Sequence, residues 1–184
     1  MDRVLSVQRL SVLDLLDPDE VNKRATVTPL SDDEFENIFV VEPDVAANQP
    51  LIMSMRVREI QKFRRGFLRK LRPDMHGKRA EWERFVAIKI AGDGMGMYPR
   101  LLPGATVLID RHYNSLQPYH KNEVNMYAVR TKDSCIVRYV ELAGRNIVLR
   151  PHNQTHTVEI LTLSEGEGVA DYLVGRVCYM GIET

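Results

Sequence analysis

One stretch constrains the fold of this chain more than any other: residues 85–110, which read FVAIKIAGDGMGMYPRLLPGATVLID. Residues 85–91 alternate in the two-residue rhythm of a half-buried β-strand, and turn residues end the strand at 92–94. Residues 95–102 predict a short connection with one helical turn, closed by a Pro-Gly pair. Residues 105–110 predict a second strand of β-branched and aliphatic side chains. The chain is therefore expected to fold around two strands joined by a glycine-rich turn.

Several motifs in and beyond this stretch follow one another in a recognisable order. The matching residues of the turn and its second strand are Gly92, Asp93, Met95, Pro99, Gly104 and Asp110. Further along, the chain reads Val-Arg-Tyr-Val at 137–140, Leu-Arg-Pro-His-Asn at 149–153 and Val-Gly-Arg-Val at 174–177. These motifs resemble the C-terminal domain of the LexA/UmuD-type self-cleaving repressors, a serine peptidase family with a Ser-Lys dyad whose turn reads Gly-Asp-Ser-Met. The resemblance covers residues 38–180, and it is specific because the matches are several and ordered.

The chain departs from this family at the two residues that carry the chemistry. The resemblance implies a nucleophilic serine in the turn and a buried neutral lysine as its base. At the matching positions stand Gly94, which has no side chain, and Arg138, whose guanidinium stays protonated. We therefore predict an inactive site with a remaining cleft lined by Asp93, Met95 and Arg138. In such a cleft Arg138 could bind an anion, although an ion pair with an acid such as Asp93 or Glu141 is the simpler expectation.

The segment at residues 43–50, PDVAANQP, lies where the family has its self-cleavage loop. In the family this loop reads Ala-Ala-Gly-x-Pro and is cut between alanine and glycine. Here the matching residues are Ala46, Ala47 and Asn48, so asparagine replaces the small glycine after the scissile bond. Without a nucleophile, the segment is predicted to be an ordinary surface loop.

The rest of the sequence predicts a mostly β domain. Short apolar runs bounded by turn residues predict strands at residues 37–42, 124–131, 134–142, 146–150, 158–163 and 172–180. Residues 53–71 carry apolar side chains at three- and four-residue steps, which predicts a helix. With the resemblance, this gives a compact, antiparallel LexA C-terminal-like domain of the β-clip type over residues 37–184, with one packed helix. Residues 1–36 predict a helical arm followed by an acidic linker.

The charge distribution and the resemblance lead to three functional hypotheses. Acidic and basic residues balance at 25 each, but residues 1–50 are acidic and residues 56–79 are basic, so these segments could pack together or each face a partner. The resemblance implies a regulatory domain of a repressor-like transcription factor, a homodimer that reaches DNA through a helix-turn-helix domain absent from this chain. One alternative is a nucleic-acid-binding protein that uses residues 56–79. The other is a self-cleaving peptidase homologue with residual activity.

The remaining reactive residue types predict no further chemistry. Cys135 and Cys178 lie in apolar, strand-like runs and are expected to be small core residues in a reducing compartment. Four histidines fall on predicted loops, at His112, His120, His152 and His156. We expect no metal and no cofactor. No apolar run approaches the roughly 20 residues of a membrane span, and the N-terminus has no signal-peptide pattern, so we expect a cytoplasmic protein without a membrane partner.

Overall fold

The computed structural model describes residues 34–73, 79–92, 95–132 and 134–182. The chain divides into two compact units, residues 1–35 and 36–184, and the second carries the sheet. Its strands are β1 (Phe35–Val41), β2 (Val57–Arg64), β3 (Phe85–Lys89), β4 (Thr106–Asp110), β5 (Met126–Arg130), β6 (Cys135–Ala143), β7 (Asn146–Arg150), β8 (Glu159–Thr162) and β9 (Leu173–Gly181). Its helical segments are α3 (Pro43–Asn48), α4 (Arg65–Lys70) and α5 (Val169–Tyr172), with 3-10 turns η3 (Ser54–Arg56) and η4 (Met95–Met97). Within the described ranges, none of these helices is long and apolar enough to cross a membrane. The predicted helical arm lies outside the described residues.

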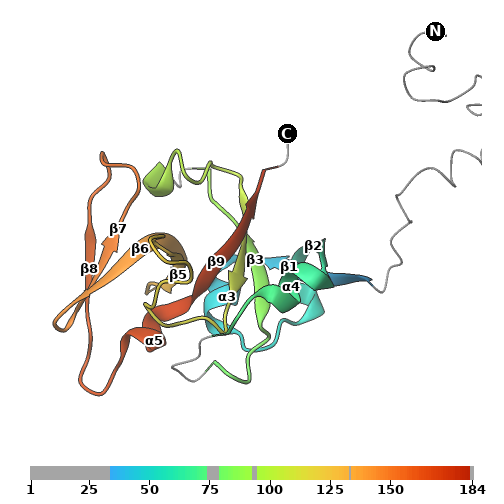
Figure 1. The fold of residues 1–184 in the computed structure, drawn as a ribbon, viewed down its shortest axis with the longest axis horizontal. Coiled ribbons are helices and arrows are strands. Elements are labelled where there is room, and N and C mark those ends of the chain that lie inside the picture. Colours follow the sequence, from blue (N-terminus) through green and yellow to red (C-terminus); the bar gives the residue numbers. More distant parts are fainter. Residues whose placement is uncertain (1–33, 74–78, 93–94, 133, 183–184) are drawn as a thin grey trace, which may run out of the picture. The chain divides into compact units, whose positions relative to one another are not determined.

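The nine strands form one sheet in the order β2-β1-β3-β4-β9-β5-β6-β7-β8. β1 runs parallel to β3, whereas the pairs from β3 to β8 along this order are antiparallel. The last strand, β9, lies between β4 and β5, so it joins the first half of the sheet to the second (Figure 1). The predicted mostly β fold is confirmed, and the parallel pair makes the sheet mixed rather than wholly antiparallel.

Both faces of the central strands β3 and β4 are buried. Val86 and Ile88 of β3 pack into one core cluster together with α3 and η4, and Phe85 and Ala87 pack into a second cluster with α4. All five residues of β4 are buried. Strands covered on both sides require near-continuous apolar runs, as the sequence has here. The predicted pair of strands around a turn is confirmed, and η4 is the predicted helical turn.

The helix predicted over residues 53–71 is wrong. This segment contains η3, the edge strand β2 and the short helix α4. Val57, Ile60 and Phe63 stand three residues apart and imitate a helical stripe, but burial in β2 alternates every second residue, which leaves Ile60 54% exposed. Pairing with β1 at the edge of the sheet overrides the local pattern.

The surface loop predicted over residues 43–50 is also wrong. These residues form α3, with Pro43 in the first turn, where its missing N–H leaves no helical hydrogen bond unmade. Ala46 and Ala47 are 0% exposed and pack in the core cluster that contains Met97 and Val137. Alanine is the strongest helix former and fits a tight core position, so the two alanines suit a buried helix.

Candidate functional site

The 3-10 turn η4 lies directly against β6, the strand that carries Arg138. The Arg138 guanidinium of β6 packs on Gly96 of η4: a Cβ added to Gly96 would lie 2.8 Å from its Cζ and Nη atoms. Asn153 fixes the same turn, because its N–H donates to the Gly96 carbonyl at 3.0 Å and its Nδ2 donates to the Met95 carbonyl at 3.2 Å. Met95 begins η4, whose Gly96 contacts Arg138 of β6. Gly94 and its neighbour at 93 lie outside the described residues.

Arg138 is held by two acceptors. Its Nη1 donates to the Val137 carbonyl at 2.8 Å, and its Nη2 pairs with the Glu159 carboxylate of β8 at 3.2 Å. The expected ion pair therefore exists, but its partner is Glu159. Glu141, one of the expected partners, pairs instead with Arg150 at 2.9 Å. A guanidinium that is always protonated and already paired cannot accept a proton, so Arg138 cannot act as a general base.

A pocket of about 230 Å³ opens beside Arg138. It is lined by residues 88–91 at and after the end of β3, by Met97 of η4, by Pro43 at the start of α3, and by residues 134–138 at the start of β6. β7 joins β6 only from Tyr139 onward, so within the described part of the chain residues 135–138 have a strand neighbour, β5, on one side only. The pocket is a mainly apolar cleft beside a half-open strand, a shape that suits an extended polypeptide.

Two buried arginines fasten the backbone of the segment that matches the cleavage loop. Arg111 is 0% exposed, and its guanidinium donates to the carbonyls of Gln49 at 2.7 Å and Pro50 at 3.0 Å, and through Nε to Glu83 at 2.6 Å. Arg79 is 5% exposed and donates to the Ala47 carbonyl at 3.5 Å. The indole ring of Trp82 lies beneath both guanidinium groups, 4.2 Å from Arg79 and 5.1 Å from Arg111. Three backbone carbonyls of residues 47–50, those of Ala47, Gln49 and Pro50, therefore accept hydrogen bonds from buried arginines.

Burial lowers the pKa of both of these arginines to about 10. Both remain charged at neutral pH, so each hydrogen bond to a carbonyl is charge-assisted. Asn48, which follows Ala47 in the predicted cleavage segment, is exposed, and its Nδ2 donates to the Asp44 carbonyl at 2.9 Å within α3. The sequence analysis missed Arg79 and Arg111, because their partners are distant along the chain and no local pattern marks them.

Comparison with known protein families assigns the domain. The family model described as Peptidase S24-like matches residues 54–177, well over half of the chain. The chain belongs to the Peptidase S24-like family. No curated protein matches it. The family match contains η4 and β6, the two elements that meet at Arg138, and it begins after α3.

Besides Arg138, the described wall of the pocket carries the reactive side chains of Ser134, Cys135 and Lys89, and Lys89 pairs with Glu59 at 2.7 Å. Cys135 lines the pocket, but burial raises the pKa of its thiol to about 12, so it is a protonated thiol and a poor nucleophile at neutral pH. No histidine lines the described wall of the pocket. His112 bonds the Trp82 carbonyl at 2.8 Å, and His152 bonds the Tyr139 hydroxyl at 2.9 Å. The prediction that Cys135 is a core residue is confirmed.

Proposed function

We propose that this S24-like domain is the dimerising regulatory part of a repressor-like transcription factor and does not cleave itself. The observation that carries the proposal is the packing of the Arg138 guanidinium on Gly96, next to the turn that bears Gly94. This packing supports the proposal, because Arg138 occupies the expected base position and η4 follows directly after Gly94, the expected nucleophile position. Neither residue can perform its step, because a glycine has no nucleophilic atom and an arginine has no free lone pair at neutral pH.

The conformation of the former cleavage segment supports the same proposal. A peptide bond must leave its helix and enter a cleft before a nucleophile can attack its carbonyl in the required geometry. The bond after Ala47 lies in α3, the Ala47 side chain is fully buried, and the Arg79 guanidinium approaches its carbonyl. Cleavage there would require α3 to unfold and the contacts of Arg111 to break.

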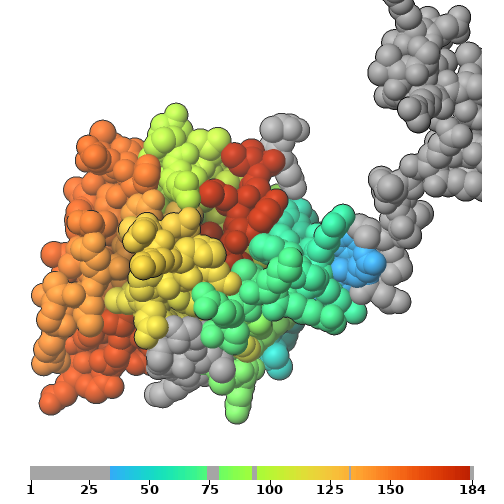
Figure 2. Space-filling view, in the orientation of Figure 1, coloured from blue at the N-terminus to red at the C-terminus, as the bar shows by residue number. Residues whose placement is uncertain are grey.

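The end of β9 offers a surface for a second copy of the chain. β5 pairs with β9 only as far as Arg176, so within the described strands residues 177–181 have β4 on one side and no strand on the other. Tyr179 and Met180 are 46% and 39% exposed on this part of the strand, and Figure 2 shows it at the surface in red. Two such edges related by a two-fold axis would pair with each other. A dimer of this kind would hold two DNA-binding domains at the spacing of a symmetric operator.

Self-cleavage is tested by incubating the purified full chain from pH 7 to pH 10 and measuring its intact mass. We expect one species of unchanged mass, both for the natural chain and for Arg138→Met. The proposed inactivity would be refuted by fragments cut between Ala47 and Asn48. Such fragments would show an active peptidase if they disappear in Arg138→Met but persist in the surface control Arg150→Met.

Dimerisation is tested separately by light scattering at micromolar concentration. We expect twice the mass of one chain, and a shift toward the single-chain mass for Met180→Asp. The matched control is Ile160→Asp, which places the same charge on an exposed apolar residue of β8 and should leave the mass unchanged. A natural chain that is monomeric throughout would refute dimerisation without bearing on cleavage.

A further inference from the structure

One side of the sheet carries an unusual density of exposed positive charge. Residues 56–72 contain eight basic side chains and one acid, Glu59. All eight basic residues are exposed, and they are called the basic face below: Arg56, Arg58, Lys62, Arg64, Arg65, Arg69, Lys70 and Arg72. The single acid is half-buried and pairs with Lys89 at 2.7 Å. The basic face therefore carries a large net positive charge.

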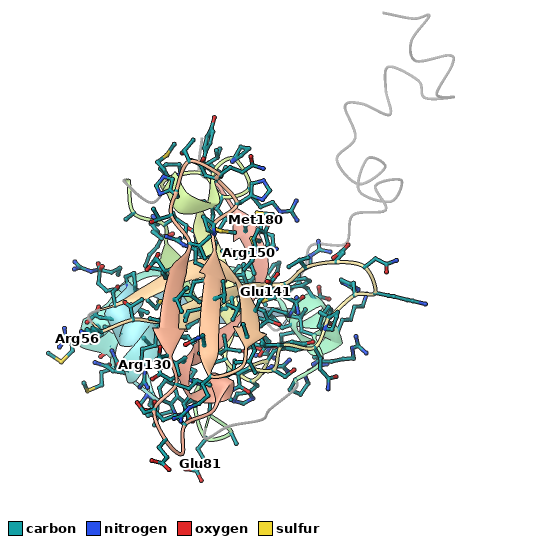
Figure 3. All side chains as sticks on the ribbon, turned by 90° about the vertical axis from the view of Figure 1, so that its left-hand side faces the viewer. Arg56, Glu81, Arg130, Glu141, Arg150 and Met180 are labelled. Atoms are coloured by element: carbon teal, nitrogen blue, oxygen red, sulfur yellow. The ribbon has the colours of Figure 1, made fainter. Side chains whose placement is uncertain are left out.

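The geometry of β2 and α4 gathers these charges along one edge. Burial in β2 alternates, so Arg58, Lys62 and Arg64 share its exposed face with Ile60, and α4 follows without a break. Eight strand residues span about 26 Å. Figure 2 shows this segment, in blue-green, as a continuous exposed surface, and Figure 3 places Arg56 far from Arg150, on another side of the molecule.

Three of these eight residues, Arg58, Lys62 and Arg72, have partners within the chain. Arg58 pairs with Glu42 at 2.9 Å, where both side chains are more than half exposed, and Arg72 donates to the Tyr119 carbonyl at 3.0 Å. Across the described ranges, the group formed by Arg64, Arg65, Arg69 and Lys70 makes no ion pair. Arg65 and Arg69 of this group stand four residues apart in α4, a spacing at which like charges repel, and a bound polyanion would relieve that repulsion.

Protection of a sheet edge explains only part of this pattern. Edge strands commonly carry charged residues that discourage pairing with other chains, and this accounts for Arg58, Lys62 and Arg64 on β2. It does not account for the basic residues of α4, which is not a strand. Six of the eight basic residues are arginines, whose planar guanidinium binds phosphate through two parallel hydrogen bonds.

We propose that the basic face binds the phosphate backbone of nucleic acid, without reading its sequence. An elongated row of arginines fits a linear polyanion, because successive guanidinium groups meet successive phosphates. A membrane surface fits less well: interfacial binding needs a broad apolar face beside the charges, and Ile60 is the one apolar side chain on the exposed face of β2. The contact needs neither the cleft nor a dimer, so it stands apart from the function proposed above.

The test uses the full chain and a fluorescent 30-base-pair duplex of arbitrary sequence, measured by anisotropy. Four phosphate contacts predict a roughly 100-fold loss of affinity between 50 and 200 mM salt. The variant Arg64→Glu/Arg65→Glu/Arg69→Glu should lose at least tenfold in affinity at 50 mM salt. Its control, Arg100→Glu/Lys132→Glu/Arg150→Glu, makes the same charge change elsewhere on the surface and should lose much less.

A milder variant separates binding from folding. Arg64→Gln/Arg69→Gln keeps the size and polarity of the side chains and should lower the slope of log affinity against log salt by about two. An unchanged slope, or equal losses in the two triple variants, would overturn the proposal. So would binding of the natural chain to vesicles of anionic phospholipid but not to the duplex, since that outcome assigns the basic face to a lipid surface.

Discussion

The replacement of Arg111 by methionine tests how the segment after α3 is fixed. The Arg111 side chain is fully buried and makes three hydrogen bonds, all to backbone carbonyls: Glu83, Gln49 and Pro50. Methionine fills much of the same volume but donates no hydrogen bond. The variant would therefore leave three carbonyls without their donor while the core around them stays filled.

The magnitude follows from two opposing terms. Each hydrogen bond to a charged group contributes about 1.5–3 kcal/mol, so losing three of them costs about 4–9 kcal/mol. Against this, burial lowers the pKa of Arg111 to about 10, which corresponds to about 3 kcal/mol against the charged form in the folded state. Methionine removes that penalty as well. We expect a net loss of about 3 kcal/mol in the free energy of unfolding, or about 6–12 °C in Tm for a chain of this size.

The assay is urea unfolding, fitted with one slope of unfolding free energy against urea concentration for all variants, followed by amide hydrogen exchange. Arg111→Met should also raise the exchange rate of amides in α3, because residues 49–50 no longer anchor that helix. Arg111→Lys should recover only part of the loss, since one ammonium cannot serve three carbonyls in the fork geometry of arginine. Arg150→Met, on an exposed ion pair, should cost under about 0.5 kcal/mol. A loss below about 1 kcal/mol in Arg111→Met would refute the reasoning.

Three other predictions concern the core and the site. Gly175→Ala should destabilise by about 1–3 kcal/mol in urea unfolding, because the added Cβ would lie 2.4 Å from the Asp110 carbonyl oxygen. Gly96→Ala should cost about 1 kcal/mol in the natural chain but far less in an Arg138→Ala background, and this coupling, measured as a double-mutant cycle, would vanish if the guanidinium did not lie on η4. The thiols of Cys135 and Cys178 have pKa values raised to about 12 by burial, so a thiol reagent at pH 8 should label neither until the chain is unfolded. Because these pKa values are higher in the folded than in the unfolded chain, the protonated thiols contribute to the free energy of unfolding. This contribution is complete below the unfolded thiol pKa, about 8.5, and should decline as pH rises toward 12.

The elements that the sequence predicted correctly are those in which local and long-range preferences agree. β3 and β4 are apolar on both faces, and the turn between them contains Gly and Pro at positions where chain reversal requires them. β2 was mistaken for a helix because Val57, Ile60 and Phe63 satisfy a three-residue step, while pairing with β1 depends on a strand many residues earlier. α3 was mistaken for a loop, although Pro43 in its first turn and two alanines favour a helix.

The candidate site was predictable only where the family pattern marks it. Position 138 could be identified from the Val-Arg-Tyr-Val motif, but its partner Glu159 lies 21 residues away on another strand. Arg111 and Gln49 are 62 residues apart, and only the folded sheet brings them together. Contacts of that separation leave no period or spacing in the sequence, so buried polar networks of this kind become visible only in the structure.

Arginine at position 138 has a structural consequence that a lysine there would not have. A buried lysine can become neutral by releasing its proton, so a pocket can hold it without a counter-ion. Arginine cannot, and the structure supplies the counter-charge through Glu159 of β8, with Val137 as a second acceptor. Arg138 thereby links β6, the turn at Gly96 and the edge strand β8. Arg138 therefore joins three elements beside a pocket of about 230 Å³, and its contacts keep the cleft in shape.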